Sequence, residues 1–222
     1  MIPGGRSAAL VCAVLLLAPA PPAQALPPTR DEIAQWCNDA DDTTHCGRLI
    51  EAQQLKRLPG LARRDGVNLQ VALFPSGTAA FTDVDDARGS TYYSLWDTLD
   101  PINAVVLYVT RDDKASYIVL QRNTGRRTEM PADPALSSDR THLVTADFCA
   151  NDCTNEVVLW RVTREGITRE ATWQPQPGWS DAAVRWKDED TLVAEYTPVG
   201  ASDARTVERK LSDPVWRRNP AH

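Results

Sequence analysis

Beyond residue 25 the sequence has no apolar run that approaches the ~20 residues needed to cross a bilayer. It also has no run of basic residues: 24 Lys and Arg stand against 30 Asp and Glu, which gives a net charge of −6. Nucleic acids and anionic lipids attract positive charge, so an acidic chain without a basic run argues against both as partners. We therefore expect a protein that does not span a membrane and binds no nucleic acid.

Residues that carry common catalytic motifs are scarce. The chain has three histidines, at 45, 142 and 222, and no G-x-S-x-G sequence of the kind that surrounds many hydrolase serines. Carboxylates are plentiful and two of them could act as a glycosidase pair. Most lie in expected turns, with Asp147 and Glu156 as exceptions, and no spacing selects them. We expect no catalytic residue, no metal and no cofactor, and we favour a protein that is not an enzyme.

The first 25 residues have the pattern of a secretory signal peptide. Arg6 supplies the positive charge, residues 8–18 are apolar, and Ala23–Ala25 is a small-x-small cleavage site. Cleavage there would leave Leu26 at the mature N-terminus. Cys12 lies in the middle of the apolar segment, which argues against a lipoprotein. The sequence therefore predicts a periplasmic or secreted protein with a signal peptide over residues 1–25.

Four cysteines follow the expected signal peptide, at positions 37, 46, 149 and 153. An even number of cysteines in an exported chain predicts disulfide bonds. Three pairings are possible, and proximity favours Cys37–Cys46 and Cys149–Cys153, because each pair closes a short polar loop. The alternative is a redox pair or a metal site, although Cys149 and Cys153 are separated by three residues where a thioredoxin-type pair has two.

Two helices are expected before residue 60. Thr29 and Glu32 match the T-x-x-E pattern of a capping box at the first helix. Apolar residues that recur at spacings of three and four predict the second, from about Thr44 to Leu58. The first disulfide would link the helices across an acidic turn at residues 38–42. Carboxylates in this turn or in residues 83–89 could bind calcium, although neither segment has the spacing of an EF-hand loop.

From Gly66 onward, apolar and polar residues alternate in short runs that end at Asn, Asp, Gly or Pro, which is typical of antiparallel strands. The expected strands are 68–73, 78–83, 92–99, 105–111, 115–122, 126–129, 141–148, 156–163, 167–174, 182–186, 191–196 and 206–211. The predicted fold class is mainly β, built of antiparallel meanders. The predicted domains are a helical hairpin (26–60), a β domain (61–212) and a tail (213–222).

Part of this pattern resembles the blades of β-propellers of the WD-repeat and TolB type. The resemblance is carried by Pro-Ala-Leu-Ser-Ser-Asp at residues 134–139, by residues 157–162 as an inner strand, and by residues 179–188 at the start of the next unit. It implies meander blades, and at ~40–45 residues per blade the chain has room for about four. A partial or small propeller and an open, twisted antiparallel sheet are both consistent with it. It carries over no activity.

Aromatic residues give the best indication of a binding site. Trp160 and Trp186 fall within apolar strand patterns, so we assign them to the core. Trp179 is expected in a loop, where its ring would be free to contact a sugar or a protein. Trp179 and Asp181 are therefore the candidate binding residues. The sequence favours an exported module that binds a protein or an envelope component; the alternative is a carbohydrate-binding or glycan-cleaving protein that uses loop aromatics and acids.

Overall fold

The computed structural model describes residues 28–112 and 114–218. The expected signal peptide and cleavage site lie outside the described residues, as do residues 219–222 of the expected tail. The described residues form two α-helices, one short 3-10 helix and sixteen strands, all of them paired antiparallel. The predicted fold class, mainly β with a helical N-terminal hairpin, is therefore confirmed.

The two helices are α1 (Arg30–Trp36) and α2 (Thr43–Arg57). The predicted capping box is present: the Thr29 amide donates to Glu32 Oε2 at 2.8 Å and the Glu32 amide to Thr29 Oγ1 at 3.2 Å. The Cys37–Cys46 disulfide joins the two helices, which confirms the expected hairpin. No helix in the described part of the chain has the length and apolar character needed to cross a membrane.

The strands form four sheets in which neighbouring strands also follow one another along the chain, except that the last strand joins the third sheet. Sheet 1 contains β1 (Ala62–Asp65), β2 (Asn68–Ala72) and β3 (Thr78–Thr82). Sheet 2 contains β4 (Val84–Asp86), β5 (Gly89–Leu99), β6 (Ala104–Arg111), β7 (Lys114–Gln121) and β8 (Arg127–Met130), with the 3-10 helix η1 (Asp100–Ile102) between β5 and β6. Sheet 3 contains β9 (Ala135–Leu136), β10 (His142–Asp147), β11 (Glu156–Val162), β12 (Ile167–Trp173) and β16 (Arg217–Arg218). Sheet 4 contains β13 (Trp179–Trp186), β14 (Thr191–Pro198) and β15 (Arg205–Lys210).

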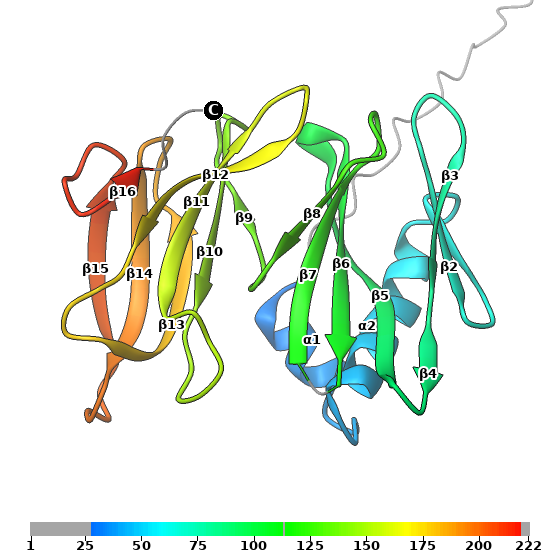
Figure 1. Ribbon diagram of the computed structural model, residues 1–222, viewed down its shortest axis with the longest axis horizontal. Coiled ribbons are helices and arrows are strands. Elements are labelled where there is room, and N and C mark those ends of the chain that lie inside the picture. Colours follow the sequence, from blue (N-terminus) through cyan, green and yellow to red (C-terminus); the bar gives the residue numbers. More distant parts are fainter. Residues whose placement is uncertain (1–27, 113, 219–222) are drawn as a thin grey trace, which may run out of the picture.

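The sheets lie side by side in chain order, with sheet 1 at one end of the molecule and sheet 4 at the other (Figure 1). One apolar cluster fills each of the three spaces between neighbouring sheets. Central strands supply side chains to two clusters, because successive residues of a strand point to opposite faces: Leu107 of β6 packs toward sheet 1 and Val106 toward sheet 3. The described residues therefore form an open stack of sheets.

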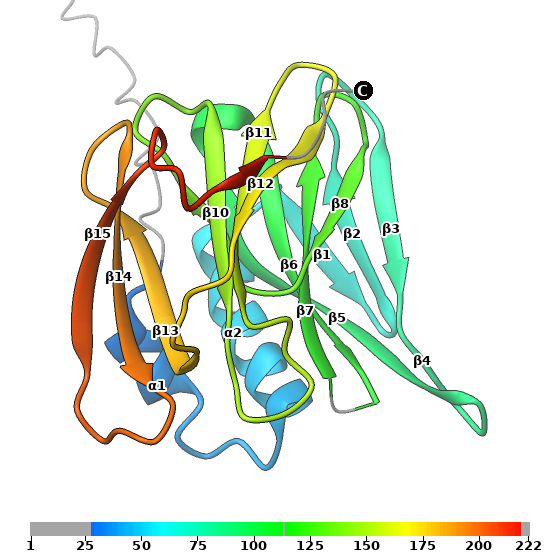
Figure 2. The ribbon, with the colours of Figure 1, turned by 60° about the vertical axis from the view of Figure 1, so that its left-hand side comes forward.

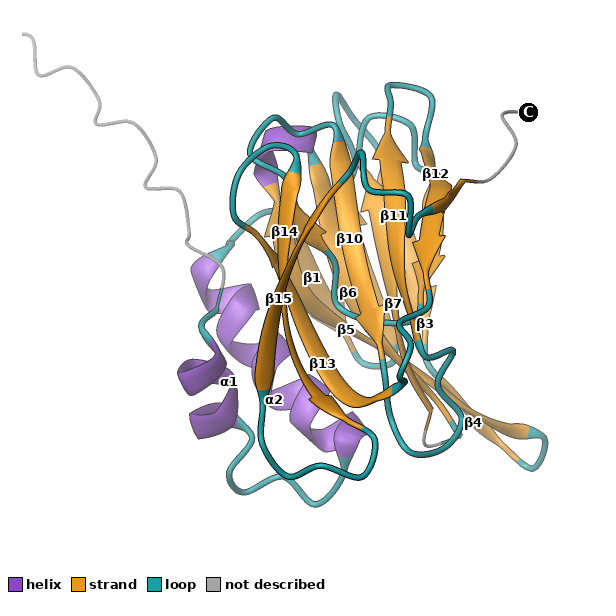
Figure 3. Cartoon of the chain, turned by 90° about the vertical axis from the view of Figure 1, so that its left-hand side faces the viewer, coloured by secondary structure: helices purple, strands orange, loops and turns teal. Residues whose placement is uncertain are grey.

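The helical hairpin lies along one side of this stack, between its two ends (Figure 3). Helix α2 packs along β5, and Ile50 at its centre is fully buried in the cluster between sheets 2 and 3. The expected boundary at residue 60 therefore separates two kinds of secondary structure that share one core.

Four strands lie where the sequence predicted none, and one of them is the two-residue β9. β1 has no apolar alternation, and β4 occupies part of the expected polar loop at residues 83–89. β16 lies in the expected tail and pairs with β12. Just before it, Trp216 is buried, and its indole donates to the Lys210 carbonyl at 2.9 Å. The prediction of a simple tail from residue 213 is therefore wrong up to residue 218, because one large apolar ring fixes this segment to the core.

Candidate functional site

A cleft of about 370 Å³ lies where sheet 4 meets the end of sheet 3. We call it the arginine cleft and define it by six residues: Trp173, Trp179, Tyr196, Arg205, Arg209 and Arg217. The β12–β13 loop, residues 174–177, and the segment that leads into β16 complete its walls. The cleft therefore brings together side chains from β12, β13, β14, β15 and β16, and Figure 2 shows how these elements surround one corner of the stack.

Three packed aromatic rings form the floor of the cleft. Trp179 stacks on Tyr196 with ring centroids 4.2 Å apart, and Trp173 meets Trp179 edge to face at 5.0 Å. Phe148 packs against Trp179 from the core, at 5.1 Å. These contacts leave Trp179 only 5% exposed. Its ring supports the floor and offers no open face on which a sugar could stack.

The predicted position of Trp179 in a loop is therefore wrong. Trp179 is the first residue of β13, and it pairs with Pro198 of β14. The structure also separates it from Asp181: Asp181 is exposed and does not line the cleft, whereas Trp179 does. In a regular strand these two residues would share a face, but a β-bulge interrupts the register between them.

Three arginines form the rim. Arg205 and Arg209 lie on the same face of β15, since they are four residues apart with Val207 between them. The Arg209 guanidinium lies 5.1 Å from the ring of Trp173, and its Nη1 donates to the Glu208 carbonyl at 2.9 Å. Its Nε is buried and has no hydrogen-bond partner among the described residues. Arg205 and Arg217 are exposed.

The charge around these arginines is unbalanced. Within residues 28–112 and 114–218, none of the three forms a salt bridge and no carboxylate lines the cleft. Some exposed arginines elsewhere are paired, as Arg218 is with Glu170 at 2.5 Å and Arg111 with Glu129 at 2.8 Å. The distinctive feature of the cleft is that three arginines without a salt bridge among the described residues line one cavity. A guanidinium presents a planar fork of donors that matches a carboxylate or a phosphate. The cleft is therefore a local positive site on an acidic protein, suited to an anionic group.

A second arrangement contains a hydroxyl, an imidazole and a carboxylate. His142 is 7% exposed, with Nδ1 2.7 Å from Thr141 Oγ1 and Nε2 3.2 Å from Glu170 Oε2. The Thr141 hydroxyl donates to Asp139 Oδ2 at 2.6 Å, and Glu170 also binds Arg161 at 2.8 Å. A nucleophilic hydroxyl needs to give its proton to the imidazole, but here it gives it to a carboxylate. We therefore interpret these contacts as structural: they fix the conformation of the chain at the start of β10.

The other candidate acids are also committed to local contacts. Asp147 accepts hydrogen bonds from the Thr154 amide and hydroxyl at 2.7 and 2.8 Å, which fixes the loop closed by the Cys149–Cys153 disulfide. Glu156 pairs with Arg169 at 2.6 Å. Asp42 caps α2, accepting from the His45 amide at 2.7 Å. Among the described residues no group of three His, Cys, Asp or Glu side chains is arranged to hold a metal.

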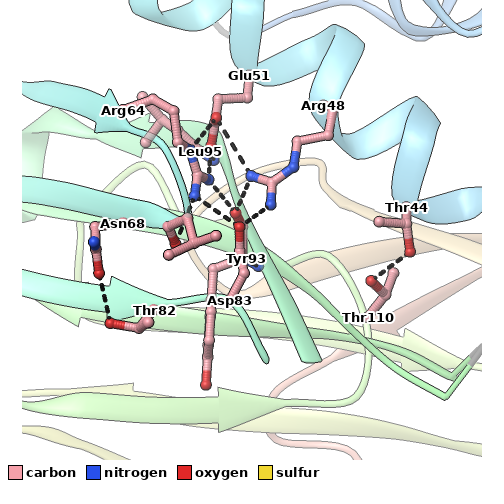
Figure 4. Close-up of polar contacts among 11 residues, drawn as sticks. Thr44, Arg48, Glu51, Arg64, Asn68, Thr82, Asp83, Tyr93, Leu95 and Thr110 are labelled. Carbon is pink, nitrogen blue, oxygen red and sulfur yellow. Dashed lines mark hydrogen bonds and ion pairs between the residues drawn. The ribbon is translucent and has the colours of Figure 1, made fainter. Parts of the chain in front are cut away.

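A buried ionic network connects α2 to sheets 1 and 2 (Figure 4). Glu51, 3% exposed, accepts from Arg64 at 2.8 and 2.7 Å and from the Leu95 amide at 3.0 Å. Asp83 accepts from Arg64 at 3.0 Å and also binds Arg48. Sequence reasoning missed this network and placed Asp83 at the end of an expected strand, where the polar segment 83–89 begins. Because its members are mutually paired and none of them lines the arginine cleft, we interpret the network as structural.

Asp97 of β5 is a half-buried carboxylate beside a β-bulge. Burial raises the pKa of Asp97 from 3.8 to about 7, and the charges of Asp133 and Asp100 act in the same direction. The folded protein therefore retains a proton that the unfolded chain releases between about pH 4 and 7. In this window the free energy of unfolding must fall as the pH rises.

We expect Asp97→Asn to remove most of this pH dependence. After allowance for partial exposure, the effect should be about 2 kcal/mol between pH 5 and 8, with the substitution stabilising at pH 8. Urea unfolding of both proteins at the two pH values measures it. Asp65→Asn, which changes an exposed carboxylate, is the matched control. Equal pH slopes for the wild type and Asp97→Asn would show that Asp97 is ionised in the fold.

Comparisons with known proteins give no family for this chain: no family model matches, and neither the curated proteins nor the solved structures provide a match. The arginine cleft is therefore interpreted from its own geometry.

Proposed function

We propose that this chain is an exported, non-enzymatic binding protein whose arginine cleft holds an anionic group of a partner protein or an envelope component. One observation supports it most: three arginines without carboxylate partners among the described residues line a cleft with an aromatic floor. The leader-like pattern of residues 1–25 and the two disulfides support a periplasmic or secreted location.

The cleft favours a bound anion for electrostatic reasons. A hydrogen bond to a charged group contributes about 1.5–3 kcal/mol, and an apolar floor strengthens it because water is partly excluded. The indole of Trp173 holds the Arg209 guanidinium in place before a ligand arrives, so little side-chain entropy remains to be lost. The net negative charge of the chain repels an anion at long range. The affinity should therefore come from direct contacts between the anion and the arginines.

The alternative, a carbohydrate-binding or glycan-cleaving protein, has weaker support. Neutral sugars stack on exposed aromatic faces, and the face of Trp179 is covered by Tyr196. No carboxylate lines the cleft to serve as a glycosidase acid. An acidic sugar is the one carbohydrate class that the arginines favour.

The propeller resemblance enters here as a proposal about the scaffold. Apart from β16 in sheet 3, each sheet is a meander, and neighbouring sheets share apolar clusters face to face, as propeller blades do. Sheets 2 and 3 have five strands each, whereas a propeller blade has four. We propose an open run of propeller-like layers.

The proposed anion site predicts the effect of removing two arginines. The double variant Arg205→Gln/Arg217→Gln should bind a fluorescent oligoglutamate or oligogalacturonate at least about tenfold more weakly, since it loses two charge-assisted contacts. Titration by fluorescence anisotropy at low salt measures this. Arg88→Gln is the control, because Arg88 is 89% exposed on the distant β4–β5 hairpin. If the wild type binds neither probe, or the double variant binds equally well, the cleft is not an anion site.

A further inference from the structure

We propose that the natural occupant of the arginine cleft is an extended polypeptide segment that adds to the edge of β15 and carries acidic side chains on either side of an apolar one. This inference rests on the proposed function and makes it more specific. It derives from two features: the order of side chains along β15 and the main-chain groups at its free edge.

The order of side chains matches an extended peptide. Arg205, Val207 and Arg209 occupy successive positions on one face of β15, so a cation, an apolar group and a second cation repeat at about 6.6 Å. A neighbouring extended strand has the same repeat, and residues directly opposite one another interact. An acid–apolar–acid pattern at alternate residues would therefore place each carboxylate beside an arginine and the apolar side chain beside Val207.

The opposite face of β15 sets a second condition. Thr206 and Glu208 lie there, and Glu208 pairs with Lys187 of the β13–β14 turn at 2.8 Å. Carboxylates on that face of an added strand would meet Glu208, and like charges on opposite residues destabilise a sheet. The site should therefore prefer acids on one face only, which distinguishes it from a general polyanion site.

The edge of β15 is open over a short stretch. β15 is the outermost strand of sheet 4, as Figure 2 shows. The Leu211 amide donates to the Asp190 carbonyl at 2.8 Å, and antiparallel pairing alternates, so the main-chain groups of Thr206, Glu208 and Lys210 point away from β14.

Intramolecular contacts then cover one end of this edge. The Lys210 amide donates to Asp213 Oδ2 at 3.1 Å, and its carbonyl accepts from Trp216. The Glu208 carbonyl accepts from Arg209. The amide and carbonyl of Thr206 and the amide of Glu208 have no such contact among the described residues, and both residues are exposed. These groups can hold a peptide by strand addition.

A matched pair of peptides tests the pattern. The first, acetyl-Thr-Glu-Thr-Val-Lys-Glu-Thr-amide, has both acids and the valine on one face; the second exchanges its lysine with the following glutamate, so that the acids lie on opposite faces. Composition and charge are equal. Isothermal titration of the chain lacking its first 25 residues should show the first peptide binding at least about tenfold more tightly.

Two changes test strand addition itself. Methylation of the peptide amides that face β15 should weaken binding at least about tenfold without any change to the protein. Thr206→Pro should have the same effect, since it removes an amide that points away from β14, and oligogalacturonate binding should stay unchanged. If the two peptides bind equally, or methylation has no effect, the peptide proposal fails while the anion site stands. If neither peptide nor oligogalacturonate binds, both proposals fail.

Discussion

Replacement of Glu51 by alanine is expected to lower the free energy of unfolding by about 3–5 kcal/mol. The side chain of Glu51 is 4% exposed. It accepts hydrogen bonds from Nε and Nη2 of Arg64 and from the Leu95 amide. Its removal leaves Arg64, with a side chain 17% exposed, only partly neutralised by Asp83, and leaves a main-chain donor of β5 without its partner. Most of this loss comes from the Arg64 guanidinium and the Leu95 amide, because each stays buried without the carboxylate that compensated for its removal from water.

Urea denaturation followed by tryptophan fluorescence measures this loss. Asp86→Ala is the control, since Asp86 pairs with Arg88 on an exposed hairpin and its removal should leave the unfolding midpoint unchanged within error. The double variant Glu51→Leu/Arg64→Met should recover a large part of the loss, because it removes both charges together. A loss of less than about 1 kcal/mol for Glu51→Ala would mean that water reaches the network and solvates both arginines.

Local patterns predicted the parts of the fold that depend on neighbours in the chain. The alternation in residues 68–82 gave the β2–β3 hairpin, and the apolar runs on both sides of residue 112 gave β6 and β7. Both disulfides close loops of fewer than ten residues, so proximity was enough to pair the cysteines. The capping box at Thr29 is likewise a contact between residues three apart.

Contacts between distant segments had no such signal. Arg64 comes from a strand without apolar alternation, and the network that it forms reaches α2 and β5. The arginine cleft needs Arg205 from the edge of sheet 4 and Arg217 from a two-residue strand in sheet 3. A single arginine in a sequence is typical of a solvated surface. Its role is defined only by which charges the fold places around it, and this depends on tertiary contacts.

The burial of Trp179 also depends on contacts between distant segments, and we expect its removal to cause a large loss of stability. Flanking Gly178 and Ser180 indicated a loop, yet the bulge after Trp179 turns its indole into the space between sheets 3 and 4. There it contacts Phe148, Trp173 and Tyr196. Trp179→Ala should therefore destabilise the protein by about 3–5 kcal/mol, because it removes a large buried ring and leaves a cavity that packed neighbours can only partly fill.

Thermal and urea unfolding measure this effect, and Trp36→Ala is the matched control. Trp36 is half-buried on α1, where the Arg57 guanidinium lies over its ring at 4.7 Å, so its loss should cost less than half as much. Trp179→Phe keeps an aromatic ring in the floor and should retain most of the stability and the anion binding. If Trp179→Ala instead keeps the wild-type midpoint but loses binding of the acidic probes, the indole contacts the ligand directly and the floor is open.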